Sequence, residues 1–290
     1  MKFSIVTPSF NQGRYVGHCI DSVLSQKGNF EIQYLVLDNF SSDNSWKNIS
    51  SRLAATLEPR IQFSAVQCQD LGQADAINKG LLQCDGDIFA FLNSDDVLAP
   101  ESLVRVQEAF DENPDIDFVY GRAHFIDENN TITGDYDTFD IKNHKLCSHC
   151  FISQPATFFR QRAYKHLGPF SLTLENSFDY EYWLRAVHAG FQFKYLPDFL
   201  ASTRLHGGTK SFNNRADIHR ENFLIQLKYC GGISDEIYHQ YLLENSTAQK
   251  VLRYFGMEST SLAISLRRIM AYMYRKQTIE ELKGQLDQYF

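Results

Sequence analysis

The chain has 290 residues, a hydrophobic content of 43% and a net charge of −7 at neutral pH. A chain of this length can bury a large core, and the acidic balance argues against a general nucleic-acid binder, since such proteins present a basic face to phosphates. No apolar run approaches the roughly 20 residues of a membrane-spanning helix, and Met1-Lys2 leads into a strand-like segment without a signal-peptide core. We therefore expect a cytoplasmic globular protein without a membrane span.

Up to about residue 120, short apolar runs alternate with longer amphipathic segments. The runs FSIV, IQYLVL, IQFSAV and DIFAFL are typical of buried strands. Helices are expected after Tyr15, Asp43, Gln73 and Pro100, with Pro100 at the first helical position of the last. This alternation predicts a parallel sheet covered on both faces, whose ligands bind in the loops at the strand C-termini. These loops contain TPSFNQG, LDNFSSDNS and LNSDD.

The pattern changes after Asp117. The segments DFVYGRAHFID and TITGDY predict an antiparallel hairpin around Asn129-Asn130, which makes the sheet mixed. The stretch GGTKSFNNR after His206 predicts a mobile loop, and residues from about 216 to 290 have a helical pattern. A further helix that stops at Gly190 is predicted from the spacing of Tyr180, Trp183, Leu184 and Val187.

Six cysteines are scattered along the chain, so we expect reduced thiols and no disulfide framework. Zinc-type donors gather within seven residues at His144, Cys147, His149 and Cys150. A structural zinc site normally pairs two separated knuckles, and the sequence contains no second Cys-x-x-Cys. Reduced thiols in a loop are therefore favoured over zinc.

Carboxylates end two strands of the predicted sheet, at Asp38 and at the adjacent pair Asp95 and Asp96. Their loops can converge, because the C-termini of parallel strands lie at one edge of the sheet. Magnesium and manganese take oxygen ligands and share them with substrate phosphates. We therefore expect a metal ion carrying a diphosphate here. A solvated turn is the alternative for the pair, although the next helix has its own start signal at Pro100.

Six motifs follow one another in the chain: TPSFNQGRYVGHCIDSVLSQ, LVLDNFSSDNS, GQADAINKGL, FLNSDD, QPATFFRQRAY and DYEYWLRA. Together they resemble a family 2 glycosyltransferase of the GT-A fold, over roughly residues 3 to 211. The resemblance implies an α/β fold, a Rossmann-like mixed β-sheet flanked by helices, with a helical C-terminal tail. The GT-A domain would span residues 1–214, with a nucleotide-binding half at 1–97 and an acceptor half at 98–214, followed by a helical extension at 215–290.

The resemblance also implies an inverting transfer of a sugar from a nucleotide-sugar donor, usually a UDP- or dTDP-sugar, with a divalent metal, Mn²⁺ or Mg²⁺. Pro8 and Ser9 would border the nucleotide. Asp38 would accept the N–H of the base, with an Asx turn at the strand end as the alternative. The other residues implied for the donor are Gln73, Asp75, Asn78, Asn93, Ser94, Gln154 and Lys210. Ordinary packing is the alternative for Gln73, Asn78 and Gln154.

The metal motif departs from the usual Asp-x-Asp, because the chain has Asn93-Ser94-Asp95. The resemblance therefore implies Asp95 as the principal metal ligand. Near the end of the match, His206 would approach metal or diphosphate, and a neutral structural histidine is the alternative. Arg204 and Lys210 could screen the leaving diphosphate.

Asp179 is implied as the catalytic base that deprotonates the acceptor hydroxyl. Phe178 stands where the family commonly has an acidic residue, and it could dry the site and raise the basicity of the carboxylate. Plain N-capping of the helix is the alternative for Asp179. Glu181 is the second candidate, although its position should face elsewhere on the helix.

The resemblance suggests a glycan or lipid-linked acceptor in the synthesis of cell-envelope or surface polysaccharide. The basic, partly apolar stretch SLAISLRRIMAYMYRKQ near the C-terminus can rest on an anionic membrane as a peripheral contact. It can also pack on the catalytic domain or on a second subunit of a homodimer, and packing is favoured.

Two rival functions stay open. A sugar-nucleotide nucleotidyltransferase would need a glycine-rich, basic loop after the first strand, where this chain has only Gly13 and Arg14. A catalytically weak nucleotide-sugar-binding protein of the same fold is favoured by Asn93 and Phe178.

Overall fold

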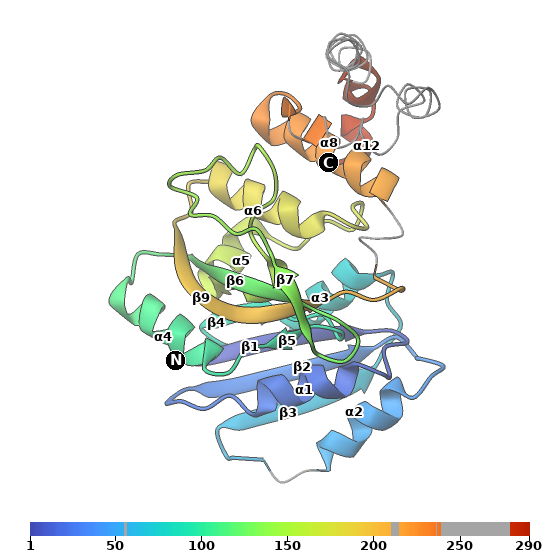
Figure 1. Cartoon of the computed structure of the whole chain (residues 1–290), viewed down its shortest axis with the longest axis vertical. Helices are drawn as coiled ribbons and strands as arrows, with labels where there is room; N and C mark the ends of the chain where they lie inside the picture. The colour runs from blue at the N-terminus through green and yellow to red at the C-terminus, as the bar shows by residue number, and fades with distance from the viewer. Residues whose placement is uncertain (55–56, 210–214, 236, 239–278) are drawn as a thin grey trace.

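The structure is a computed structural model that describes residues 1–54, 57–209, 215–235, 237–238 and 279–290 (Figure 1). Its first half is a parallel sheet in the spatial order β3-β2-β1-β4. The four strands are β1 (Lys2–Ser9), β2 (Glu31–Asp38), β3 (Ile61–Gln67) and β4 (Ile88–Phe91). They coincide with the four predicted apolar runs, which confirms the parallel half of the sheet.

The second half of the chain extends the same sheet with mixed strand directions. β8 lies antiparallel to β4 and β6, β9 runs parallel to β6, and the short β5 pairs antiparallel with β9. The predicted hairpin is present as β6 and β7, with Asn130 in the left-handed region at its turn (φ 66). The bounds are β5 (Val97–Leu98), β6 (Phe118–Ile126), β7 (Ile132–Asp135), β8 (Thr157–Arg160) and β9 (Phe193–Arg204).

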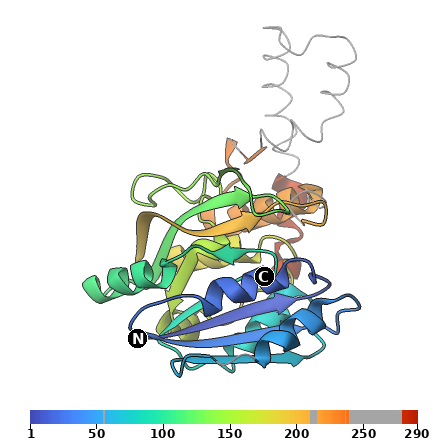
Figure 2. The same cartoon turned by 60° about the horizontal axis from the view of Figure 1, so that its bottom comes forward.

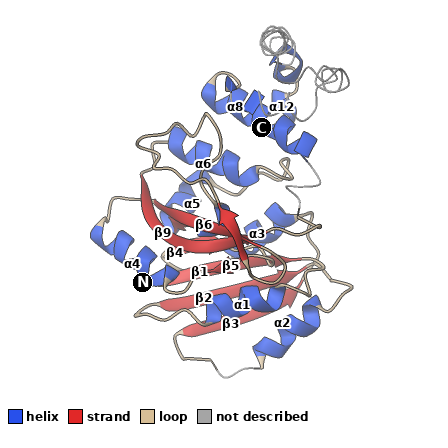
Figure 3. Cartoon of the chain, in the orientation of Figure 1, coloured by secondary structure: helices blue, strands red, loops and turns tan. Residues whose placement is uncertain are grey.

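Helices cover both faces of the sheet (Figure 3). Alternate strand residues enter different cores, with Ile5 and Val36 in one and Val6 and Leu35 in the other. The first core includes α1 (Val16–Leu24), α2 (Ser45–Leu53) and α4 (Ser102–Glu112). The second includes α3 (Gln73–Leu81), α5 (Gln161–Leu167) and α6 (Phe178–His188). The α/β fold with a mixed sheet between helices is therefore confirmed.

The prediction that Pro100 opens a helix is wrong. The chain first forms β5, and α4 begins only at Ser102, after Glu101 in the left-handed conformation (φ 61). The cause is long-range, because β5 pairs with Ala201 and Ser202 of β9.

The C-terminal region contributes α8 (Arg215–Cys230) and α12 (Leu286–Tyr289), which lie beyond α6, at the opposite end of the molecule from β3 (Figures 1 and 2). A small separate core, which includes Phe223, Leu227 and Leu282, joins them. The predicted basic stretch and most of the predicted mobile loop lie outside the described residues. Within the described part of the chain, no helix has both the length and the apolar character needed to cross a membrane. The division at residues 214 and 215 stays a prediction.

The prediction that all six cysteines are reduced thiols is wrong, because Cys147 and Cys230 form a disulfide bond. The fold brings the loop between β7 and η1 (Gln154–Ala156) against the end of α8, where the two Cα atoms lie 5.8 Å apart. The partners are 83 residues apart in the chain, so their spacing in the sequence carries no sign of the bond.

Candidate active site

A cleft of about 830 Å³ opens at the C-terminal ends of β1 and β4, and its volume lies in the range of small-molecule sites. The start of α6, the residues around η1 and the end of β9 complete its walls. Parallel strands place their C-terminal loops at this edge, as the sequence predicted. The cleft brings together eight of the predicted site residues: Pro8, Ser9, Gln73, Asn93, Ser94, Asp95, Gln154 and Asp179.

Three buried polar atoms of the cleft-lining residues have no hydrogen-bond partner in the described part of the protein. They are the Oγ atoms of Ser9 and Ser153 and the Oε1 atom of Gln154. The other end of the Gln154 amide donates to the carbonyl of Phe91 (2.7 Å), which fixes the side chain. Buried polar atoms are nearly always paired in native proteins. The cleft therefore offers hydrogen bonds that suit a hydroxyl-rich ligand.

Asp95 and His206 meet at the edge of this cleft. The Nε2 atom of His206 lies 3.0 Å from the Oδ2 atom of Asp95, and the Nδ1 atom accepts the backbone N–H of Gly208 (3.2 Å). The imidazole also packs on the ring of Tyr15, at 4.7 Å between centroids. Because Nδ1 accepts this N–H, the ring proton of a neutral imidazole lies on Nε2, which donates it to the Asp95 carboxylate. The two side chains are thereby held against each other.

The pair fits a hard divalent cation that shares its ligands with a substrate. An ion bound by both side chains would replace the hydrogen bond between them, and the ring proton of His206 would then lie on Nδ1. Across the described ranges, no cluster of three or more His, Cys, Asp or Glu side chains could hold an ion by itself. Magnesium commonly takes only one or two protein ligands and completes its shell with water and substrate phosphates. Asp95 and His206 match that arrangement.

Asp96 is buried and belongs to the frame of the site. Burial raises the pKa of its carboxyl well above the ordinary value, and the neighbouring charge of Asp95 adds to the effect. Its Oδ1 atom accepts the backbone N–H of Arg204 (2.9 Å). The buried Arg204 guanidinium donates to the carbonyls of Asp95 (2.8 Å) and Asp127 (2.7 Å) and to Asn130 Oδ1 (2.7 Å). Arg204 therefore stabilises the loop that carries Asp95. Its guanidinium, which was predicted to screen a diphosphate, is engaged in these contacts.

Asn93 links the two sides of the cleft. Its Oδ1 atom accepts from the amide of Gln73 at the start of α3 (2.5 Å), and its amide donates to Asp96 (3.4 Å). The residue that replaces the first aspartate of the metal motif thus connects α3 with the loop after β4.

Asp179 is the second residue of α6 and is partly buried. Burial raises the pKa of its carboxyl to about 6. The backbone N–H of Tyr180, which donates to Oδ1 (2.8 Å), has the opposite and smaller effect on this pKa. Phe178 is buried beside it, with its ring 6.0 Å from that of Phe91 and 5.9 Å from that of Phe170. Phe178 and Phe91 line the cleft, so the apolar wall predicted from the sequence lies next to the carboxylate. A pKa near neutrality suits a general base.

Glu181, the second candidate base, is turned away from the cleft. Its buried carboxylate forms an ion pair with Arg185 (2.7 Å) and accepts the hydroxyl of Tyr229 in α8. These contacts join α6 to α8.

Three predicted donor-binding residues, Asp38, Asp75 and Asn78, lie outside the cleft wall. The buried Asp38 carboxylate closes a turn by accepting the N–H and hydroxyl of Ser41, which is the Asx-type alternative. Asp75 accepts the backbone N–H of Leu71 and pairs with Lys79, which lowers the pKa of the Asp75 carboxyl. The amide of Asn78 exchanges two hydrogen bonds with the backbone of Phe170, and Lys210 lies outside the described residues.

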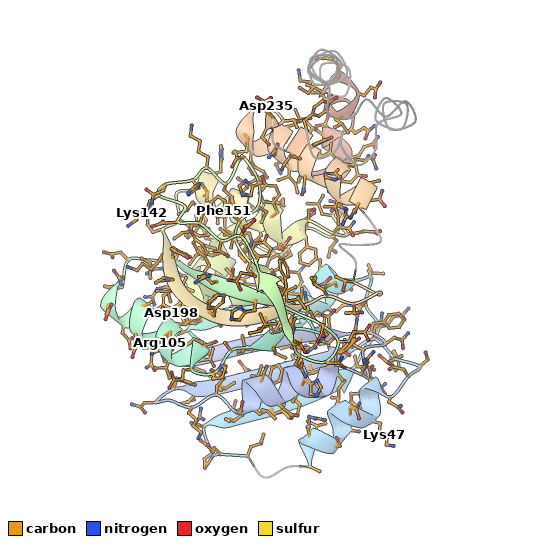
Figure 4. All side chains as sticks on the ribbon, in the orientation of Figure 1. Lys47, Arg105, Lys142, Phe151, Asp198 and Asp235 are labelled. Carbon is orange, nitrogen blue, oxygen red and sulfur yellow. A yellow bond between two sulfur atoms is a disulfide. The ribbon has the colours of Figure 1, made fainter. Side chains whose placement is uncertain are left out.

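The loop between β7 and η1, in which Figure 4 labels Lys142 and Phe151, closes one side of the cleft. Phe151 is fully buried, and Ile152 and Ser153 after it line the cleft. Tyr136, at the start of this loop, also lines the cleft and donates its hydroxyl to the carbonyl of Cys150 (3.0 Å). None of these residues was predicted to take part in the site.

Glu221 of α8 was also missed. Its buried carboxylate accepts backbone N–H groups from the segment just before α6. One signal was available in the sequence, because Glu221 stands three and four positions before Leu224 and Ile225 and so falls on the buried face of its helix.

Comparison with known proteins agrees with this geometry. The family described as glycosyl transferase family 2 matches residues 4–168. The chain belongs to this family. Among curated relatives, the chondroitin synthase of Escherichia coli is 27% identical over 220 residues, which cover 76% of this chain. The chain spans only 31% of the length of that synthase.

Solved structures share the fold of this chain. TarS 1-349 of S. aureus in complex with UDP superposes with a TM-score of 0.64 at 16% identity, covering 100% of this chain and 91% of that one. The mannosyltransferase PcManGT of Pyrobaculum calidifontis, in complex with GDP-Man and Mn²⁺, superposes with a TM-score of 0.60 at 12% identity, covering 98% and 86%. At these identities the likeness concerns the fold.

Proposed function

We propose that this glycosyltransferase moves a sugar from a nucleoside diphosphate sugar to a hydroxyl of a glycan or lipid-linked acceptor, with inversion at the anomeric carbon. The observation that carries the proposal is the position of two acidic centres in one cleft, Asp95 with His206 at one place and Asp179 at another. The donor complexes of the two structural neighbours, with UDP in one and with GDP-Man and Mn²⁺ in the other, support a nucleotide-linked donor. UDP- and dTDP-sugars are the donors we expect first.

Different residues of the cleft contact the donor and take the proton of the acceptor. Pro8, Ser9 and Gln73 border the donor. The unpaired Gln154 Oε1 atom accepts a hydrogen bond from one of its hydroxyl groups, and the unpaired Ser153 hydroxyl can donate or accept. The acceptor oxygen attacks the anomeric carbon while the bond from that carbon to the diphosphate breaks. The ionised Asp179 carboxylate takes the proton of the acceptor hydroxyl, for which its pKa of about 6 is suitable.

Asp95 and His206 are the residues that would hold Mn²⁺ or Mg²⁺. Such an ion, when bound, supplies positive charge that stabilises the diphosphate as a leaving group. The protein's contribution is to hold the two ligands 3.0 Å apart on a buried frame made by Asp96 and Arg204.

The test is a thermal-shift screen of nucleoside diphosphate sugars, with Mn²⁺ and with a chelator. A donor present at about 100 times its dissociation constant should stabilise the fold by roughly 2.7 kcal/mol. We expect a larger shift with Mn²⁺, and the Asp95→Asn variant should lose this metal-dependent part. Equal shifts with and without metal would contradict the metal site, and no shift with any donor would contradict the proposed function.

A catalytically weak binding protein of the same fold is the second candidate, favoured by Phe178 at the usual acidic position. Incubation of the stabilising donor with acceptor glycans separates the two, because a binding protein releases no nucleoside diphosphate. The raised pKa of Asp179 next to the buried Phe178 favours the enzyme.

A further inference from the structure

Helix α8 lies beside α6 (Figure 1), outside the segment that matches the family. One of its carboxylates contacts the segment that leads into α6. The side chain of Glu221 is buried, with 6% of the residue exposed. Its Oε1 atom accepts the backbone N–H of Glu175 (2.9 Å), and its Oε2 atom accepts those of Asn176 (3.0 Å) and Ser177 (2.7 Å). One carboxylate from α8 therefore fixes three consecutive peptide groups.

These peptide groups lead directly into the catalytic helix. Ser177 is the N-cap of α6, and its own side chain makes no capping hydrogen bond. In a capping box, a glutamate within the same helix accepts the N-cap N–H. Here Glu221 accepts that N–H from another helix, 44 residues further along the chain. Asp179 follows the N-cap by two residues, and Asn176 itself lines the cleft.

We propose that Glu221 is a positioning residue, which sets the place of Asp179 in the cleft by holding the backbone of residues 175–177. The inference rests on the proposed function, because it takes Asp179 as the base. It also means that the C-terminal helices belong to the catalytic unit, so residues 1–214 by themselves lack a part of the site.

Because Glu221 is charged, its removal should have a measurable effect on the titration of Asp179. Three titratable groups of the described structure act on this carboxyl or respond to it: Glu221 from α8, Tyr136 after β7, and Cys150 in the loop before η1. Burial raises the pKa values of Tyr136 and Cys150, so both are neutral near pH 7. Of these three groups, Glu221 is the one whose charge raises the pKa of Asp179.

The experiment uses the full chain and compares Glu221→Gln with Asp217→Asn. The control removes one negative charge from the same helix, at an exposed position one turn earlier. Both carboxylate oxygens of Glu221 accept backbone N–H groups, whereas glutamine has one acceptor oxygen and an NH₂ group that only donates. We therefore expect the start of α6 to shift. A misplacement of about 1 Å can cost up to 10²-fold in rate, and we expect kcat to fall about tenfold. The donor KM should stay within about twofold, since the metal and donor groups are elsewhere.

The pH profile is the second readout. Loss of the Glu221 charge should move the acid limb of kcat/KM to lower pH, while Asp217→Asn should leave both kcat and the limb unchanged. A merely structural role would lower the melting temperature without these changes, and that outcome would overturn the proposal.

If Glu221→Gln does not fold, Glu221→Asp provides the test, because it keeps the charge and shortens the reach. It should lower kcat while its acid limb stays at the wild-type pH. Wild-type kcat in Glu221→Asp would overturn the proposal. Absence of turnover in the wild type would instead overturn the proposed function, and the inference with it.

Discussion

Turnover should decline below neutral pH with an apparent pKa near 6, the value to which burial raises the Asp179 carboxyl. A base with a pKa of about 6 is about 90% ionised at pH 7 and about 10% ionised at pH 5. The rate should therefore drop about tenfold between these two values. A carboxyl at its ordinary pKa near 4 would lose only about a tenth of the rate over the same interval.

The assay follows release of the nucleoside diphosphate as kcat/KM for the acceptor, which reports the free enzyme's groups. Donor binding at each pH, measured by thermal shift, controls for loss of the substrate complex. Asp179→Asn should lose about 10² to 10⁴ in rate and should show no acid limb, because an amide has no proton to lose in this range. Asparagine can still cap a helix, so donor affinity should stay near the wild-type value.

The unfolding free energy should change with pH in the opposite sense to turnover: the contribution of Asp179 to it should fall as the pH rises. Between about pH 4 and pH 6 the folded state binds more protons at Asp179 than the unfolded state, so this group makes the wild type less stable as pH rises through that window. A shift of about two pKa units corresponds to on the order of 2 to 3 kcal/mol. Asp179→Asn should therefore raise the unfolding free energy at pH 8 by up to this amount and should change it little at pH 4. An Asp179→Asn enzyme with full turnover, or a wild-type acid limb near pH 4, would refute the reasoning.

Asp95→Ala should weaken metal-dependent donor binding and turnover together, since this carboxylate acts in the ground state and the transition state; an unchanged thermal shift with donor and Mn²⁺ would contradict it. Glu181→Gln should lower the unfolding free energy by about 3 kcal/mol, because the buried ion pair with Arg185 is lost. Turnover per folded molecule should stay within about twofold, and a hundredfold loss would indicate Glu181 as the base. Cys147→Ser should cost about 2 to 4 kcal/mol in denaturant titration without reductant. With reductant the variant and the wild type should agree, and a wild type insensitive to reductant would exclude the bond to Cys230.

Local sequence patterns determined the parallel half of the sheet. The positions of β1 to β4 can be predicted from the apolar runs alone. A buried strand needs consecutive apolar residues, and the turns that flank it need polar ones. The same local logic placed Asp95 after a strand, at the C-terminal edge of the sheet. For Asp179 it indicated only a helix start, and its place in the same site was implied by the family resemblance.

Contacts between distant residues decided the rest. His206 meets Asp95 across 111 positions, and Glu221 reaches the start of α6 across 44 to 46 positions. The disulfide between Cys147 and Cys230 likewise depends on two segments packing together. Sequence patterns report the neighbours along the chain, whereas these pairings depend on how the sheet and α8 are packed. At Asp38 the turn with Ser41 is local, three positions along the chain, and was the alternative that the sequence already offered, whereas a contact of this carboxylate with a nucleotide base stays a prediction. Only the tertiary structure brings Gln67 of the neighbouring strand to the same carboxylate, across 29 positions, because that contact depends on the pairing of β2 with β3.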